Sequence, residues 1–143
     1  MDHAAEAPWN RLTRSADEHF RDGRFADALG LYENALGLLR ASTTDGALTQ
    51  RMLMARIASH HNRAAALTKL GRLAEAEEEY GAAYAFVQSV VLDALAPVPL
   101  REAARCHCAL AFAEWQCFRR EQGRALELER EALRRNGGRR KLQ

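Results

Sequence analysis

Two groups of histidine and cysteine carry the most reactive side chains of this sequence. His60 and His61 are adjacent, and Cys106, His107 and Cys108 form a second run further along the chain. Imidazole and thiolate together suit Zn²⁺ or another borderline metal ion, and heme iron also takes His or Cys as a ligand. The spacing matches no known metal signature, and adjacent residues on a helix point about 100° apart. Binding of a transition metal or heme through these five residues is therefore one function that the sequence suggests.

Catalytic chemistry has less support. The sequence contains no Gly-rich phosphate loop and no serine elbow, and its only Gly-Gly pair, Gly137-Gly138, lies close to the C-terminus. A Cys106–His107 dyad fails on geometry, because sequence neighbours on a helix do not face each other. We therefore expect a protein without enzymatic activity.

Composition and charge bound the remaining possibilities. The 143 residues are 48% hydrophobic with a formal net charge of +2, and basic residues alternate with acidic ones along the chain. This pattern predicts one globular domain and gives no indication of nucleic-acid binding. No apolar run is long enough for a membrane span, and Met1–Pro8 does not resemble a signal peptide. The three cysteines fall in one predicted helix and cannot pair there, so we expect reduced thiols in the cytoplasm.

The hydrophobic pattern predicts an all-α fold, because apolar residues recur at intervals of three and four rather than two. Gly23, Gly71 and the Pro97-Val98-Pro99 segment are the expected breaks between helices. His60 lies on an apolar stripe, which also indicates a core histidine held by a hydrogen bond. Six helices are predicted, over residues 9–22, 25–40, 48–70, 73–94, 100–119 and 121–135.

A segment of the sequence recurs. Gly23–Ala28 returns as Gly71–Ala76, 48 residues later, and the echo continues through the tyrosines and alanines that follow. A weaker third copy keeps two alanines but lacks the turn glycine and has Glu129 at the tyrosine position. A repeat of this length predicts stacked helical units that bury their apolar faces against one another. The matched pairs are Tyr32 with Tyr80 and Ala35 with Ala83, and the third copy supplies Ala125 and Ala132.

These residues resemble the tetratricopeptide repeat (TPR) family, in which a Gly turn precedes Ala, Tyr and Ala in the second helix of each repeat. The resemblance implies three helical hairpins, six antiparallel helices, in a right-handed superhelical stack. The implied TPR-like domain spans residues 9–135, with repeats at 9–42, 48–94 and 100–135. Residues 1–8 and 136–143 are then flexible ends, the second of them basic. Ser59-His60-His61-Asn62 is also similar to a motif of short stand-alone bacterial TPR proteins, which implies no particular function.

The resemblance also implies where a partner binds. In the TPR fold the first helix of each hairpin lines a concave groove that holds a peptide or a helix of another protein. The leading hypothesis is therefore a non-enzymatic adaptor or chaperone with a protein partner, and the open ends of a short stack also suggest a homodimer. Carried onto this chain, the groove residues are Asn10, Thr13, Asp17, Arg21, His61, Asn62, Ala65, Lys69, His107, Leu110 and Glu114.

Overall fold

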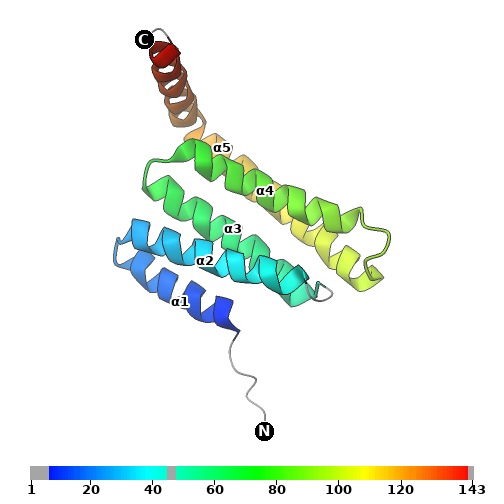
Figure 1. Cartoon of the computed structure of the whole chain (residues 1–143). Coiled ribbons are helices and arrows are strands. Elements are labelled where there is room, and N and C mark those ends of the chain that lie inside the picture. Colours follow the sequence, from blue (N-terminus) through cyan, green and yellow to red (C-terminus); the bar gives the residue numbers. More distant parts are fainter. Residues whose placement is uncertain (1–6, 45–47, 142–143) are drawn as a thin grey trace.

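The computed structural model describes residues 7–44 and 48–141, which form five α-helices and no strand (Figure 1). The predicted all-α fold is confirmed. Residues 1–6 of the predicted N-terminal segment lie outside the described residues. None of the described helices combines the length and apolar character that crossing a membrane requires. The helices are α1 (Pro8–Arg21), α2 (Phe25–Thr44), α3 (Gln50–Lys69), α4 (Leu73–Val91) and α5 (Val98–Lys141).

The recurring glycines end α1 and α3 in the same way. Gly23 and Gly71 have φ angles of 76° and 75°, a conformation that only glycine adopts without strain. At each turn the N–H of the glycine and of the following arginine close back onto the helix. Arg24 N–H bonds to the His19 carbonyl at 2.8 Å, and Arg72 N–H bonds to the Leu67 carbonyl at 2.9 Å. The sequence repeat is therefore a repeat of Schellman caps, each of which reverses the chain into an antiparallel hairpin.

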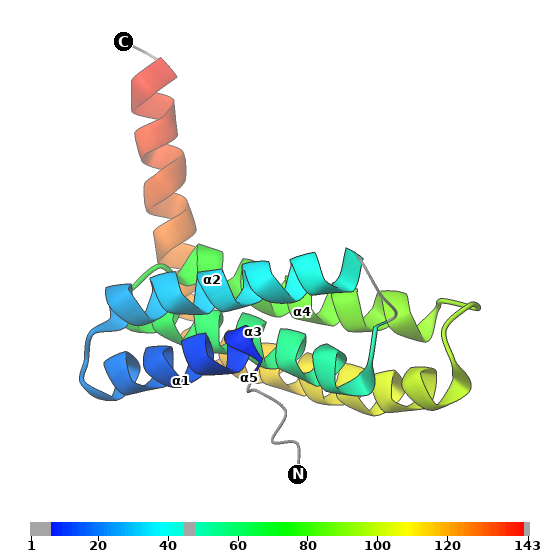
Figure 2. The same ribbon diagram turned by 60° about the horizontal axis from the view of Figure 1, so that its bottom comes forward.

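The helices form two layers around a shared core. Figure 2 shows α1, α3 and the first part of α5 in one layer, with α2 and α4 in the other. One cluster of buried apolar side chains takes residues from all five helices, from Ala16 of α1 to Leu126 of α5. Small side chains let the layers approach closely. The repeated alanines have no exposed surface: Ala28, Ala35, Ala76 and Ala83.

The C-terminal third of the chain differs from the prediction, because α5 is one helix of 44 residues. We expected two helices here, over 100–119 and 121–135, and so a third hairpin. The third copy lies 49 residues after the second, as in Ala76 and Ala125, and this register places Arg120 at the position of Gly71. An L-residue with a side chain pays a steric penalty in the left-handed conformation that both other turns require. The chain therefore continues as helix, and the expected six-helix count is wrong for the described residues.

The second half of α5 is anchored to α4 at a single place. Leu126 is only 3% exposed and belongs to the core. The Glu129 carboxylate accepts hydrogen bonds from the Leu73 N–H at 2.7 Å and the Ala74 N–H at 3.1 Å, so it caps the first turn of α4. Arg130 pairs with Glu77 at 2.9 Å.

Beyond this anchor the helix leaves the body of the molecule. Every side chain from 131 to 138 is exposed, and the end of α5 projects outward in both ribbon views (Figures 1 and 2). The sequence predicted a flexible tail from residue 136. In the structure the helix continues through Gly137 and Gly138 to Lys141. We call residues 131–141 the α5 arm.

Candidate functional site

His60 lies inside a buried network of ion pairs that joins three helices. Its side chain is almost fully buried, and its Nδ1 lies 2.8 Å from the Oε2 atom of Glu79 on α4. Arg63 donates to the other oxygen of Glu79 and, at 2.9 Å, to Glu33 on α2. Each charged group in this network has a partner of opposite charge or a hydrogen bond. His60 is thus the core histidine that the apolar stripe predicted, and Glu79 is its partner.

His61 occupies a different environment one residue later. Its ring is half-buried and lies 5.4 Å, centroid to centroid, from the ring of Tyr80. The Nε2 atom is buried and has no hydrogen-bond partner among the described residues. Burial lowers the pKa of His61 below its ordinary value, while the nearby Glu114 carboxylate acts in the opposite direction. His61 is therefore a neutral imidazole at neutral pH, with a buried polar atom that remains unsatisfied.

A cavity of about 200 Å³ opens between α3 and α5, next to Tyr80. We call it the α3–α5 cavity. Aromatic rings form part of its wall, since Tyr80 and Phe118 lie 5.0 Å apart between centroids. It brings together three of the predicted groove residues, which come from two helices distant in sequence: Ala65, Lys69 and Glu114. The remaining lining residues are Thr68, Tyr80, Cys117, Phe118, Glu121 and Gln122.

The charges around this cavity are predominantly negative. Glu114 and Glu121 come from α5, and Lys69 of α3 is the one basic residue of the lining. Burial raises the pKa of Tyr80, and the nearby groups Glu114, Cys117 and Glu121 raise it further. The Cys117 thiol donates to the Oε1 atom of Glu121 at 3.4 Å. The site therefore offers a local field that favours a cation.

The α1 residues of the predicted groove lie apart from this cavity. Asp17 and Arg21 line a separate hollow of about 370 Å³ together with Phe20. The Tyr32 hydroxyl donates to Asp17 at 2.5 Å, so this carboxylate also ties α2 to α1. Thr13 bonds to the carbonyl of its own helix, and Asn10 is half-buried.

Four further groove residues, including His61, also lie outside the cavity lining. Asn62 and His107 are half-buried, and Leu110 is largely exposed. The structure thus gathers only part of the implied groove into one hollow.

The residues of the metal alternative are dispersed. His60 is engaged by Glu79, and Cys106 is exposed on α5. Cys108 lines a different cavity, described next. Within residues 7–44 and 48–141, no three or more His, Cys, Asp or Glu side chains are arranged so as to hold a metal ion. The residue types suggested a metal site, but the fold does not bring these side chains together.

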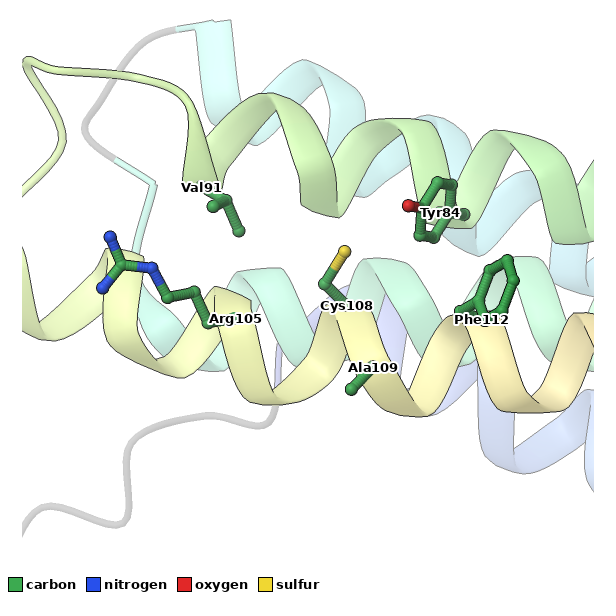
Figure 3. Close-up of a pocket in the computed structure, with 6 residues that line it drawn as sticks. All are labelled: Tyr84, Val91, Arg105, Cys108, Ala109 and Phe112. Atoms are coloured by element: carbon green, nitrogen blue, oxygen red, sulfur yellow. The ribbon is translucent and has the colours of Figure 1, made fainter.

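A second cleft, of about 340 Å³, lies between α4 and α5 (Figure 3). Arg105 stands toward one end, the Cys108 thiol points into the space between the helices, and an aromatic pair closes the other end. The rings of that pair, Tyr84 and Phe112, lie 5.6 Å apart. Val91 and Ala109 complete the lining. This cleft contains none of the predicted groove residues.

Sequence reasoning missed six of the nine residues that line the α3–α5 cavity. Tyr80 and Phe118 were not among the predicted groove residues, and Glu121 was placed at the start of a separate sixth helix. In the continuous α5, Glu121 follows Glu114 by two turns and lies on the same face. The absence of Gly or Pro from 100 to 122 is the signal that could have revealed this alignment.

Comparison with known proteins places the chain in a family without indicating an activity. Residues 7–133 match the model of a family described as "Protein of unknown function (DUF2753)", and no TPR family matched. Neither a curated protein nor a solved structure matches the chain. Because the match covers all five helices apart from the end of α5, the chain belongs to the DUF2753 family.

Proposed function

We propose that this chain is a non-enzymatic interaction module that holds a segment of a partner protein. The segment lies along the layer of α1, α3 and the first part of α5, which we call the inner layer, and is centred on the α3–α5 cavity. The observation that carries the proposal is the open cavity between α3 and α5, whose walls are aromatic and charged. Binding energy at protein interfaces concentrates on a few aromatic and arginine side chains that fill such pockets.

The TPR-like interpretation supports the same site. We interpret α1–α2 and α3–α4 as two TPR-like hairpins and the first part of α5 as the opening helix of an incomplete third. The matched Schellman turns and fully buried alanines favour this interpretation. In such a stack the layer of α1, α3 and α5 is the one that faces a bound segment.

A binding role also fits the reactive groups of the site better than catalysis does. Cys117 is the nucleophile of the lining, and its thiol donates to Glu121 rather than to a histidine. A cysteine nucleophile is normally activated by an adjacent base such as histidine. We therefore propose an adaptor or chaperone that acts in the cytoplasm on a protein partner.

Site-specific photocrosslinking in cells that express the chain tests this proposal. A photoreactive amino acid replaces Lys69 or Gln122 in the cavity, and the exposed Glu102, elsewhere on α5, serves as the matched control. We expect a discrete crosslinked protein from the cavity positions and none from position 102. Equal crosslinking at all three positions, or none at any, would contradict the proposal. Light scattering on the purified chain separately tests the predicted homodimer.

A further inference from the structure

The α3–α5 cavity has features that define the chemistry of its ligand. We propose that it binds an arginine side chain presented by the partner segment, an inference that rests on the function proposed above. The guanidinium stacks on the aromatic wall and donates to the carboxylates of α5.

The size of the cavity matches one side chain. Its volume of about 200 Å³ lies below the roughly 300–1,000 Å³ typical of pockets for drug-sized ligands and cofactors. It is also open to solvent on the side between α3 and α5, so a side chain can enter from a segment lying along the inner layer. A single anchor residue of a longer ligand is therefore the appropriate occupant.

The aromatic wall favours a flat cation. Tyr80 and Phe118 lie with ring centroids 5.0 Å apart and an interplanar angle of 34°. Arginine stacks on such ring faces, because its guanidinium is planar and weakly hydrated compared with an ammonium group. The same molecule shows this contact elsewhere: the Arg119 guanidinium lies 4.5 Å from the centre of the Trp115 ring.

The charges select a cation over an anion. Glu114 and Glu121 supply two carboxylates against the one ammonium of Lys69. Neither carboxylate forms an ion pair with a described residue, and Glu121 accepts only the weak bond from the Cys117 thiol. A guanidinium offers five donors in a fixed fork, enough to engage both carboxylates. An acidic side chain at the same place would be repelled by them.

The neutral His61 complements this arrangement. Desolvation keeps its imidazole uncharged, so no second positive charge opposes the bound cation at neutral pH.

Nuclear magnetic resonance titration with small probes tests the proposal on the full chain. The probes are N-acetyl-argininamide, the corresponding lysine and glutamate amides, and the norleucine amide, which has an alkyl chain without charge. We expect saturable shifts of the Lys69, Glu114 and Gln122 amides with the arginine probe, weaker shifts with lysine and none with glutamate. Equal shifts with norleucine, a preference for glutamate, or arginine shifts confined to other surfaces overturns the inference.

Charge-neutral variants sharpen the test. The double variant Glu114→Gln with Glu121→Gln removes both charges with little change in shape, and we expect about tenfold weaker arginine binding. The matched control is Glu102→Gln, an exposed glutamate of the same helix outside the cavity, which leaves binding unchanged. Unaltered binding in the double variant rejects the carboxylates as the determinant. The circular dichroism spectra of all variants verify that they remain folded.

The two proposals fail in distinguishable ways. A random peptide library is selected on the purified chain, and the selected peptides compete against photocrosslinking from position 69. If the competing peptides contain no basic residue, the proposed interaction module stands and arginine is rejected as its anchor. If neither crosslinks nor competing peptides are found, both proposals are rejected. Competing peptides that share an arginine, and lose affinity when it becomes norleucine, support both.

Discussion

His60 and His61 are neighbours in the chain, but their rings lie in contrasting environments. His60 is almost fully buried, and its contact with Glu79 belongs to a network in which every charge is paired. His61 is half-buried beside an open cavity, and its Nε2 has no partner among the described residues. The helical rotation of about 100° between adjacent residues accounts for the separation. The face of α3 that carries His60 holds the stack together, and the face that carries His61 leads to the α3–α5 cavity, where we propose that a ligand binds.

The largest effect is expected from breaking the network around His60. Glu79→Ala leaves His60 and Arg63 without their shared carboxylate, and we expect a loss of about 3 kcal/mol or more in the free energy of unfolding. Urea denaturation measures it. The neighbouring Glu78 is exposed, so Glu78→Ala serves as control and is expected to stay within about 0.5 kcal/mol. A loss below 1 kcal/mol for Glu79→Ala would mean that the network contributes little.

The second largest effect on stability is expected at the Gly71 turn, which reverses the chain from α3 into α4. Gly71→Ala forces an alanine into a φ of 75°, which we expect to cost about 1 kcal/mol in unfolding free energy. Gly37 lies within α2, is exposed and has open space at its Cβ position. Gly37→Ala is thus a control of opposite sign, expected to stabilise by roughly 0.5–1 kcal/mol. Thermal or urea unfolding of both variants decides; a neutral Gly71→Ala contradicts the assigned role of the turn.

A smaller effect is expected from pH. His61 is packed against Tyr80 of α4, Glu114 of α5 and its own neighbour His60, and burial lowers its pKa. Below about pH 6.5, His61 therefore binds a proton more readily in the unfolded chain than in the folded one. Stability should therefore decline as pH falls from about 6.5 to the lower pKa of folded His61, with no further contribution from His61 below that.

Removing the imidazole isolates this contribution. Urea unfolding of His61→Phe between pH 5 and 8 should show a weaker dependence on pH than the unchanged chain. The remaining dependence reports the other titrating groups of the chain. A variant with an unchanged pH profile would show that protonation of His61 does not oppose folding.

The smallest effect on stability is expected where the effect on binding is largest. Glu114→Gln alters an exposed side chain without an ion pair, so we expect the unfolding free energy to change by no more than about 0.5 kcal/mol. Crosslinking from Lys69 and binding of the arginine probe should both weaken. If Glu114→Gln lowers stability as well as binding, Glu114 supports the fold, as the network around His60 does.

Much of the fold follows from local sequence signals. Helical periodicity and the two turn glycines were enough to predict α1 to α4, because each acts within a few residues. The unbroken α5 was missed since the alanine pattern of the third copy was weighted above its missing glycine. At the turn position this copy has Arg120 in place of glycine, and the helix continues through it.

The candidate site was less predictable, because its contacts join distant parts of the chain. The hydrogen bond of His60 was expected, but nothing local identifies Glu79, 19 residues away, as its partner. The α3–α5 cavity likewise depends on the packing of two helices. The approach of Lys69 to Glu114 and Glu121 cannot be deduced from spacing along the sequence.

Because α5 is continuous, one helix carries both the carboxylates of the α3–α5 cavity and the exposed arm. Between them, Leu126 and Glu129 fix this helix against the first turn of α4. Glu114 and Glu121 precede this contact, and residues 131–141 follow it. Figure 2 shows the arm at a steep angle to the first part of α5, so the helix changes direction between the cavity and the arm. Gly123 lies one turn before Leu126, and because glycine is a weak helix former, a bend of α5 costs least in this stretch.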